Sequence, residues 1–259
     1  MRIYNEKKYF GVTDMQISQG FQYFLSGFSL ISNKGLKRFV IIPLLINLLI
    51  FGGSLFFVVD WLTQGINYFN GFLPSWLSWL EWLIWPIAIL VILFSYSTIF
   101  SVITNFIAAP FNGLLAEKVE LHLTGQKIND DGFTDLIKDV PRMLGREVSK
   151  LLYYLPKAIG FFILLWILPV IGQILWVGFT CWMFAVQYND YPFDNHKIKF
   201  TETRNKLKQN QGLSYGFGLA VMLFTMIPIV NLIVMPVAVC GATRLWVEQF
   251  RGDYRSQPL

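Results

Sequence analysis

Long uncharged runs, separated by short charged segments, dominate this chain. Runs without Asp, Glu, Lys or Arg cover residues 39–59, 82–116, 158–189 and 209–243. As a helix at 1.5 Å per residue, the first would be about 31 Å long, which is enough to cross a bilayer core. The second would be about 52 Å long, so we expect it to tilt, to extend into the cytoplasm, or to break at 108–113. These two runs predict two long transmembrane helices, at 36–60 and 82–112.

The last two runs resemble each other, with a proline near each centre. Pro169 lies in ILPVIGQ and Pro228 in MIPIVNL, which is a weak internal repeat. One crossing by each run would leave the five cations of residues 190–208 outside, against the positive-inside rule. Two crossings by each would need about 40 residues and a turn. We therefore expect two re-entrant, partly inserted helical hairpins, at 158–189 and 209–243. Their turns must be buried in protein or line a wet cavity, which indicates a pore, a binding cavity or an oligomer.

Residues 15–31 have the pattern of an amphipathic helix that lies on the membrane surface. Gln and Ser occupy one face, and Asp14 or Thr13 would cap the start of the helix. The apolar positions at helical spacing are Ile17, Phe21, Phe24, Leu25 and Phe28.

Residues 114–157 are amphipathic and charged, which predicts cytoplasmic helices. Thr134 or Asp131 would cap the second of them. Its cations, which mark the cytoplasmic side, are Lys138, Arg142, Arg146 and Lys150.

The link from 60 to 81 carries no Lys or Arg and several tryptophans, which is typical of an extracytoplasmic interface. Both chain ends are then cytoplasmic, with a cytoplasmic link at 190–208 and a tail at 244–259. The start of the chain is polar and predicts no cleaved signal peptide. We expect one all-α integral membrane domain over residues 1–259, in multi-pass topology.

Composition supports that class, since the chain is 54% hydrophobic, only 14% charged, and has a mean hydropathy of +0.49. The net charge of +5 could suggest nucleic acid, but the cations cluster at the ends of apolar runs. No Cys/His spacing predicts a metal site, and no nucleophile or nucleotide motif predicts an enzyme or a cofactor.

The strongest candidate site precedes the first membrane helix, at Gly35, Leu36, Lys37 and Arg38. A glycine turn that leads into a helix can direct backbone N–H groups at an oxyanion, and adjacent cations add charge. A cationic anchor that snorkels to the interface is the alternative interpretation.

Two carboxylates and several amides form a second set, which we interpret as a gate, a lock or a pathway. Asp190 and Asp194 lie in the aromatic segment YNDYPFDN, for which an ordinary interfacial loop is the alternative. Asn105, Asn112 and Asn231 lie within apolar runs, where an unpaired amide costs about 2–7 kcal/mol, so they should face other helices or water. Since no charge lies at the centre of a span, proton-relay pumping is not supported.

Four segments in order, GLKRFVIIPLLIN, IAAPFNGLLAEKVE, QYNDYPFDNHKIKF and PVAVCGATRLW, resemble the CysZ family of bacterial sulfate permeases. The resemblance covers essentially the whole chain. It implies an oligomeric inner-membrane protein that admits sulfate for cysteine biosynthesis. The family's Gly-Leu-Arg sulfate motif, often followed by a second arginine, corresponds to residues 35–38. Because Lys37 lacks the guanidinium fork, bidentate contact would fall mainly to Arg38.

The expected function is therefore sulfate permeation into the bacterial cytoplasm, with sulfate and membrane lipids as partners. Two alternatives stay open: a membrane scaffold that binds anionic lipid, and an anion channel of broad selectivity.

Overall fold

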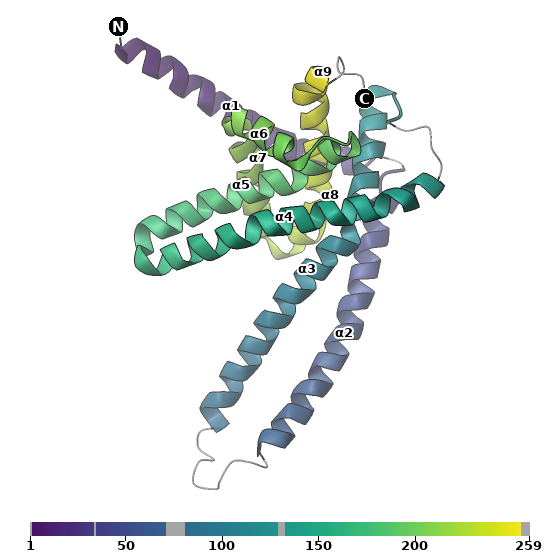
Figure 1. The fold of residues 1–259 in the computed structure, drawn as a ribbon, viewed down its shortest axis with the longest axis vertical. Helices are drawn as coiled ribbons and strands as arrows, with labels where there is room; N and C mark the ends of the chain where they lie inside the picture. The colour runs from purple at the N-terminus through teal and green to yellow at the C-terminus, as the bar shows by residue number, and fades with distance from the viewer. Residues whose placement is uncertain (1, 34, 71–80, 129–132, 255–259) are drawn as a thin grey trace. The chain divides into compact units, whose positions relative to one another are not determined.

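The structure is a computed structural model that describes residues 2–33, 35–70, 81–128 and 133–254. These residues form helices and short connections, without a strand (Figure 1). The α-helices are α1 (Arg2–Ile31), α2 (Arg38–Asn70), α3 (Glu81–Thr124), α4 (Phe133–Ile167), α5 (Pro169–Asn195), α6 (Phe200–Gln209), α7 (Gln211–Thr225), α8 (Pro228–Leu245) and α9 (Arg251–Tyr254), and a π-helix, η2 (Trp246–Phe250), joins α8 to α9.

Five helical segments of the described chain are long and apolar enough to cross a membrane, by length and composition. They are Ile41–Gly65, Trp85–Thr124, Lys138–Ile167, Pro169–Asn195 and Pro228–Tyr254. The predicted all-α membrane class is confirmed.

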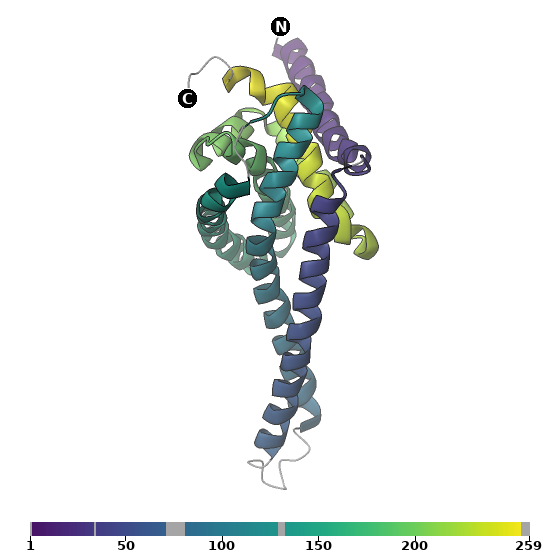
Figure 2. The same cartoon turned by 90° about the vertical axis from the view of Figure 1, so that its right-hand side faces the viewer.

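The chain divides into two compact units, of which the smaller is Ile41–Ala108. It is an antiparallel pair made by most of α2 and the first part of α3 (Figure 2). Tyr96 Oη lies 2.8 Å from Ser54 Oγ, and the Phe51 ring packs against Tyr96 and Phe100. Many other apolar side chains of this unit are exposed, as lipid contact requires.

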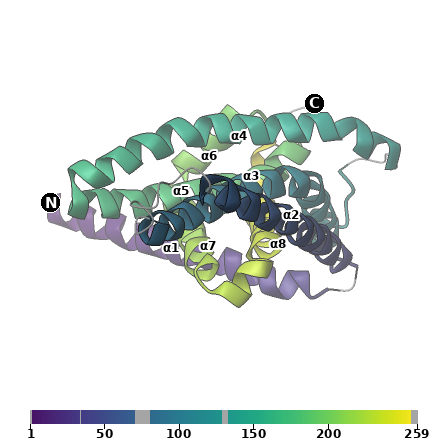
Figure 3. The same ribbon diagram turned by 90° about the horizontal axis from the view of Figure 1, so that it is seen from below.

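The larger unit comprises Met1–Val40 and Ala109–Leu259. Its helices form layers, in which α4 contacts α5, α5 contacts α7 and α8, and these two contact α1 (Figure 3). The core between them holds fully buried rings of Phe24, Phe193, Phe217 and Trp246. The helix expected on the membrane surface is thus also a core element.

Glycines let α1 approach α7 and α8 at backbone distance. A Cβ on Gly20 would lie under 3.0 Å from Leu213 O, and one on Gly216 equally close to Ile17 O. A Cβ on Gly27 would likewise lie under 3.0 Å from Val237 O, and one on Gly241 under 3.0 Å from Tyr23 O. The neighbouring atoms belong to the backbone, which cannot move as freely as a flexible side chain. These positions therefore accept no side chain.

Gly216→Ala is therefore expected to destabilise the protein by about 1–3 kcal/mol, because α1 must move away from α7. Gly178→Ala is the matched control, since a Cβ there meets nothing within 4 Å and alanine is the better helix former. Thermal unfolding in detergent measures both. Equal midpoints for the two variants would contradict the close-packing argument.

Both predicted turns lie at their prolines. α4 ends at Ile167 and α5 begins at Pro169, while α7 ends at Thr225 and α8 begins at Pro228. Proline at the first position of a helix loses no intrahelical hydrogen bond, so each proline starts the second arm of its hairpin.

Other predicted boundaries differ from the structure. No break occurs at 108–113, because α3 runs through Pro110 to Thr124. α1 begins at Arg2, so Thr13 and Asp14 lie inside the helix and cap nothing. Local residue preferences at these positions were overridden by continuous helical packing.

The helices of the expected cytoplasmic segments also extend further. α4 continues through 157 into the hairpin, so the amphipathic and apolar parts are one helix. α5 reaches Asn195 and α6 begins at Phe200, so the two helices together cover most of the link, and the tail is helical to Tyr254. Thr134 lies in the first turn of α4, whereas Asp131 falls outside the described residues.

Candidate functional site

A buried ladder of ion pairs joins α4 to α5. Arg146 donates two hydrogen bonds to the Asp190 carboxylate, of 2.6 and 2.9 Å, in a bidentate geometry. One turn away, Arg142 pairs with Asp194 at 2.6 Å. The Asp190 side chain is 0% exposed and that of Arg146 is 12% exposed. Arg146 also donates to Thr203 Oγ1, which ties α6 to the ladder.

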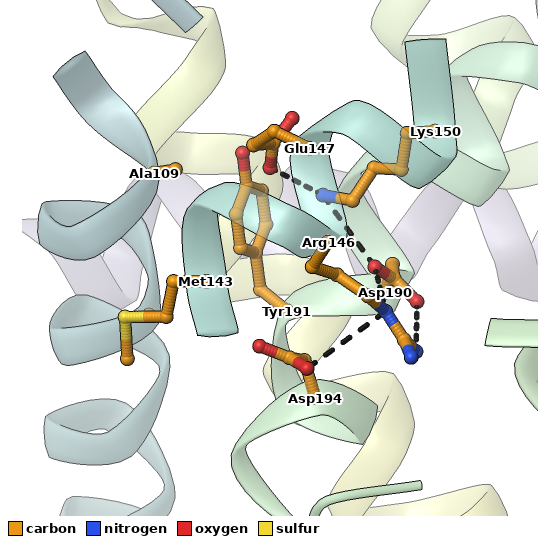
Figure 4. Close-up of a pocket in the computed structure, with 9 residues that line it drawn as sticks. Ala109, Met143, Arg146, Glu147, Lys150, Asp190, Tyr191 and Asp194 are labelled. Atoms are coloured by element: carbon orange, nitrogen blue, oxygen red, sulfur yellow. Dashed lines mark hydrogen bonds and ion pairs between the residues drawn. The ribbon is translucent and has the colours of Figure 1, made fainter. Parts of the chain in front are cut away.

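A second row of polar groups continues the ladder. Lys150 Nζ lies 2.6 Å from Glu147 Oε1, 3.5 Å from Asp190 Oδ2, and 4.0 Å from the centre of the Tyr191 ring (Figure 4). Tyr191 Oη accepts from Asn112 Nδ2 of α3 at 3.2 Å. Burial of this many charges is tolerable because each has an opposite charge or a hydrogen-bond partner.

These side chains close around a small pocket, whose other lining residues include Ala109, Gly113 and Met143 (Figure 4). The space is about 10 Å³, which is about one water molecule. At this pocket the ladder leaves no open passage for an ion as large as sulfate.

A separate buried carboxylate, Glu120, holds α3 to the last helices. It lies 3.0 Å from His196 Nε2 and 2.8 Å from Arg251 Nε. The His196 ring packs on Trp246, with centroids 4.9 Å apart. Among the described residues, no group of three or more His, Cys, Asp or Glu could hold a metal ion.

The predicted oxyanion loop connects α1 to α2. Gly35 has φ +99°, a left-handed conformation that glycine adopts without strain, and a Cβ there would meet nothing within 4 Å. Leu36 is 5% exposed and anchors the loop in the core, whereas Lys37 is exposed and α2 begins at Arg38. The side chain of Arg38 lies outside the described residues.

One detail corrects the expected set of backbone donors. The Leu36 N–H donates to Asn33 O at 3.3 Å, so it closes the turn and does not point at an anion. The side chain of Asn33 lies 3.3 Å from His122 Nε2, which links the loop to α3. The first N–H groups of α2 remain the donors for which the helix itself offers no acceptor.

The predicted gate residues are only partly brought together. Asp190, Asp194 and Asn112 belong to the ladder and its surroundings. Asn231 is exposed in the first turn of α8, and Asn105 belongs to the smaller unit.

The partners of these carboxylates were missed. Sequence analysis assigns Arg142, Arg146 and Lys150 to a cytoplasmic face, whereas in the structure they form the cationic half of the ladder, with Lys150 buried and Arg142 partly exposed. A signal existed, because these cations are four residues apart, as Asp190 and Asp194 are, so two helices would present matching charged stripes.

Comparison with known proteins agrees with this membrane architecture. A family model described as "Sulfate transporter CysZ/Etoposide-induced protein 2.4" matches residues 23–236. A protein of Vibrio parahaemolyticus named sulfate transporter CysZ is 58% identical over 236 residues, which are 90% of this chain and 95% of that protein. Proteins of the same name from Vibrio cholerae and Pectobacterium atrosepticum are 54% and 50% identical, over 93% and 90% of this chain and 98% and 86% of their own lengths. The chain therefore belongs to the sulfate transporter CysZ family.

Proposed function

We propose that this protein is a sulfate permease of the bacterial inner membrane, which supplies sulfate for cysteine biosynthesis. The observation that carries the proposal is the identity of 50–58% to proteins named sulfate transporter CysZ, over at least 90% of this chain. Helices long and apolar enough to cross a membrane provide the structural basis for transport.

The two α-helical hairpins are proposed to enter the bilayer only partly. On α4 the uncharged part, which follows Lys157, is residues 158–167, or about 15 Å at 1.5 Å per residue. α7 is 15 residues long, or about 22 Å. Both lengths fall short of a hydrocarbon core of about 30 Å, which supports insertion without full crossing.

The sulfate site is proposed at the loop of residues 35–38. Sulfate is fully ionised at neutral pH, so its site should offer donors and no carboxylate. The open space at Gly35, the exposed Lys37 and the start of α2 at Arg38 support this location. The cation-free link at 60–81 supports cytoplasmic chain ends, which would place this loop on the cytoplasmic side.

The ladder is proposed as a lock that must open for sulfate to pass. Its cations are already neutralised by Asp190, Asp194 and Glu147, so a passing dianion would have to compete with fixed carboxylates. Assembly as a homo-oligomer is part of the same proposal, since turns within the bilayer need protein or water around them.

Uptake of radiolabelled sulfate into liposomes that contain the purified protein tests the function. We expect uptake above that of protein-free liposomes, with a smaller effect of excess chloride or phosphate than of unlabelled sulfate. Equal competition by all three anions would instead identify a channel of broad selectivity. No uptake with or without a pH or voltage gradient would reject the permease and favour a membrane scaffold.

A further inference from the structure

One stripe of α4 leads from the buried ladder toward the lipid-exposed part of the hairpin. Its members are Arg146, Lys150, Tyr153 and Lys157, which recur at helical spacing. The first two cations have carboxylate partners, as described above. For Lys157, and for Arg204 of α6, the described part of the chain provides no such partner. Among residues that the structure describes, two cations near the outer end of the stripe therefore have no carboxylate partner.

These two cations share one aromatic ring. Lys157 Nζ lies 3.7 Å and Arg204 Cζ 4.4 Å from the centroid of Tyr153. Arg204 also lies 4.9 Å from the centroid of Phe200, which meets Tyr153 edge to face. Cation–π contacts fix the orientation of both groups but leave their charges uncompensated.

The guanidinium of Arg204 also has an unused donor. Its Nε is buried and has no hydrogen-bond partner, although the side chain as a whole is half-buried. Because Nε is buried, an acceptor from outside would have to meet the terminal nitrogens of the half-buried side chain. A phosphate oxygen fits, because a planar guanidinium binds phosphate through two parallel N–H groups.

The surroundings indicate that the acceptor belongs to a lipid. Exposed apolar side chains at this level of α4 include Leu152 (68%) and Leu155 (50%), and they continue to the hairpin turn. Trp182 donates from Nε1 to Tyr153 Oη at 3.1 Å, and its ring packs on Tyr215. Trp and Tyr side chains with their polar atoms together are typical of the boundary between headgroups and hydrocarbon.

We propose that Arg204 and Lys157 bind the phosphate of an anionic phospholipid, with the acyl chains along the exposed apolar face of α4. The site holds the amphipathic helix α6 and the first hairpin at the membrane surface. It is distinct from the sulfate loop and does not depend on transport. Charge complementarity and the adjoining apolar face favour a phospholipid over a free oxyanion.

The test uses the full chain in neutral detergent, titrated with dioleoyl-phosphatidylglycerol or dioleoyl-phosphatidylcholine, with retained lipid measured by native mass spectrometry. We expect affinity for phosphatidylglycerol to fall about fivefold for each of Lys157→Gln and Arg204→Gln, and affinity for phosphatidylcholine to stay unchanged. Lys208→Gln, an exposed cation of the same helix, is the matched control and should retain wild-type affinity.

Because Lys157 is exposed, its variant should fold even if the Arg204 variant does not. Wild-type affinity in the folded Lys157→Gln protein would overturn the assignment. So would displacement of phosphatidylglycerol by equimolar inorganic phosphate or sulfate, which would identify a free-anion site. Loss of sulfate uptake in Arg38→Ala with lipid affinity unchanged would separate this site from the transport proposal.

Discussion

Arg146→Ala is expected to lower the free energy of unfolding by about 3–5 kcal/mol. The reason is that Asp190, whose side chain is 0% exposed, would lose its bidentate partner and keep only Lys150, at 3.5 Å. Thermal or denaturant unfolding in detergent measures the effect. This is the largest loss we expect from any single substitution in the chain.

Two further variants separate the buried charge from the loss of side-chain volume. Arg244→Ala removes a pair with Glu248 whose side chains are 41% and 42% exposed, and should cost less than about 1 kcal/mol. Replacing the buried pair together, as Arg146→Met with Asp190→Leu, should recover most of the stability, because no unpaired charge remains. If Arg146→Ala is no worse than Arg244→Ala, the ladder does not stabilise the fold.

Arg38→Ala is expected to weaken sulfate binding by about 1.5–3 kcal/mol, which is roughly 10- to 150-fold. The proposed reason is loss of the guanidinium fork beside the first N–H groups of α2. Isothermal titration of the detergent-solubilised protein with sulfate, at fixed ionic strength, measures it.

Arg38→Lys keeps the charge without the fork and should fall between wild type and alanine. Arg244→Ala serves as a control for net charge, because that residue already pairs with Glu248. Unchanged sulfate affinity in Arg38→Ala would reject the proposed site, whatever its effect on uptake.

Sequence reasoning predicted the hairpin turns because proline acts locally. Pro169 and Pro228 have no backbone N–H, and the first position of a helix needs none. Each of them therefore begins the helix that follows the hairpin turn. The same rule failed at Pro110, where α3 continues and the missing hydrogen bond is tolerated. Whether a proline ends a helix therefore depends on how the helices on both sides of it pack, and the local sequence does not show that packing.

The ladder and the glycine contacts were not predicted, for a related reason. The charges of α4 looked like a solvated face until the partner helix was known, since Asp190 lies 44 residues from Arg146. Gly20 and Gly216 are ordinary helix residues in sequence and become essential only where two backbones approach. The glycine contacts leave no local pattern, and the matching four-residue spacing of the ladder's charges does not by itself identify the partner helix. The loop at Gly35, by contrast, is a glycine turn before a helix, as its sequence predicts, and Gly35 has φ +99°.

The ladder contains a second register. α4 and α5 run antiparallel, and Arg142 and Arg146 face Asp194 and Asp190 in the first register. One turn along, Arg146 is already 3.8 Å from Asp194, and Lys150 is 3.5 Å from Asp190. Each carboxylate therefore lies within 4 Å of two cations on successive turns of α4, since Asp194 also pairs with Arg142 and Asp190 with Arg146. The first hairpin is thus held by overlapping ion pairs, so that loss of either arginine leaves each carboxylate with a second cation within 4 Å.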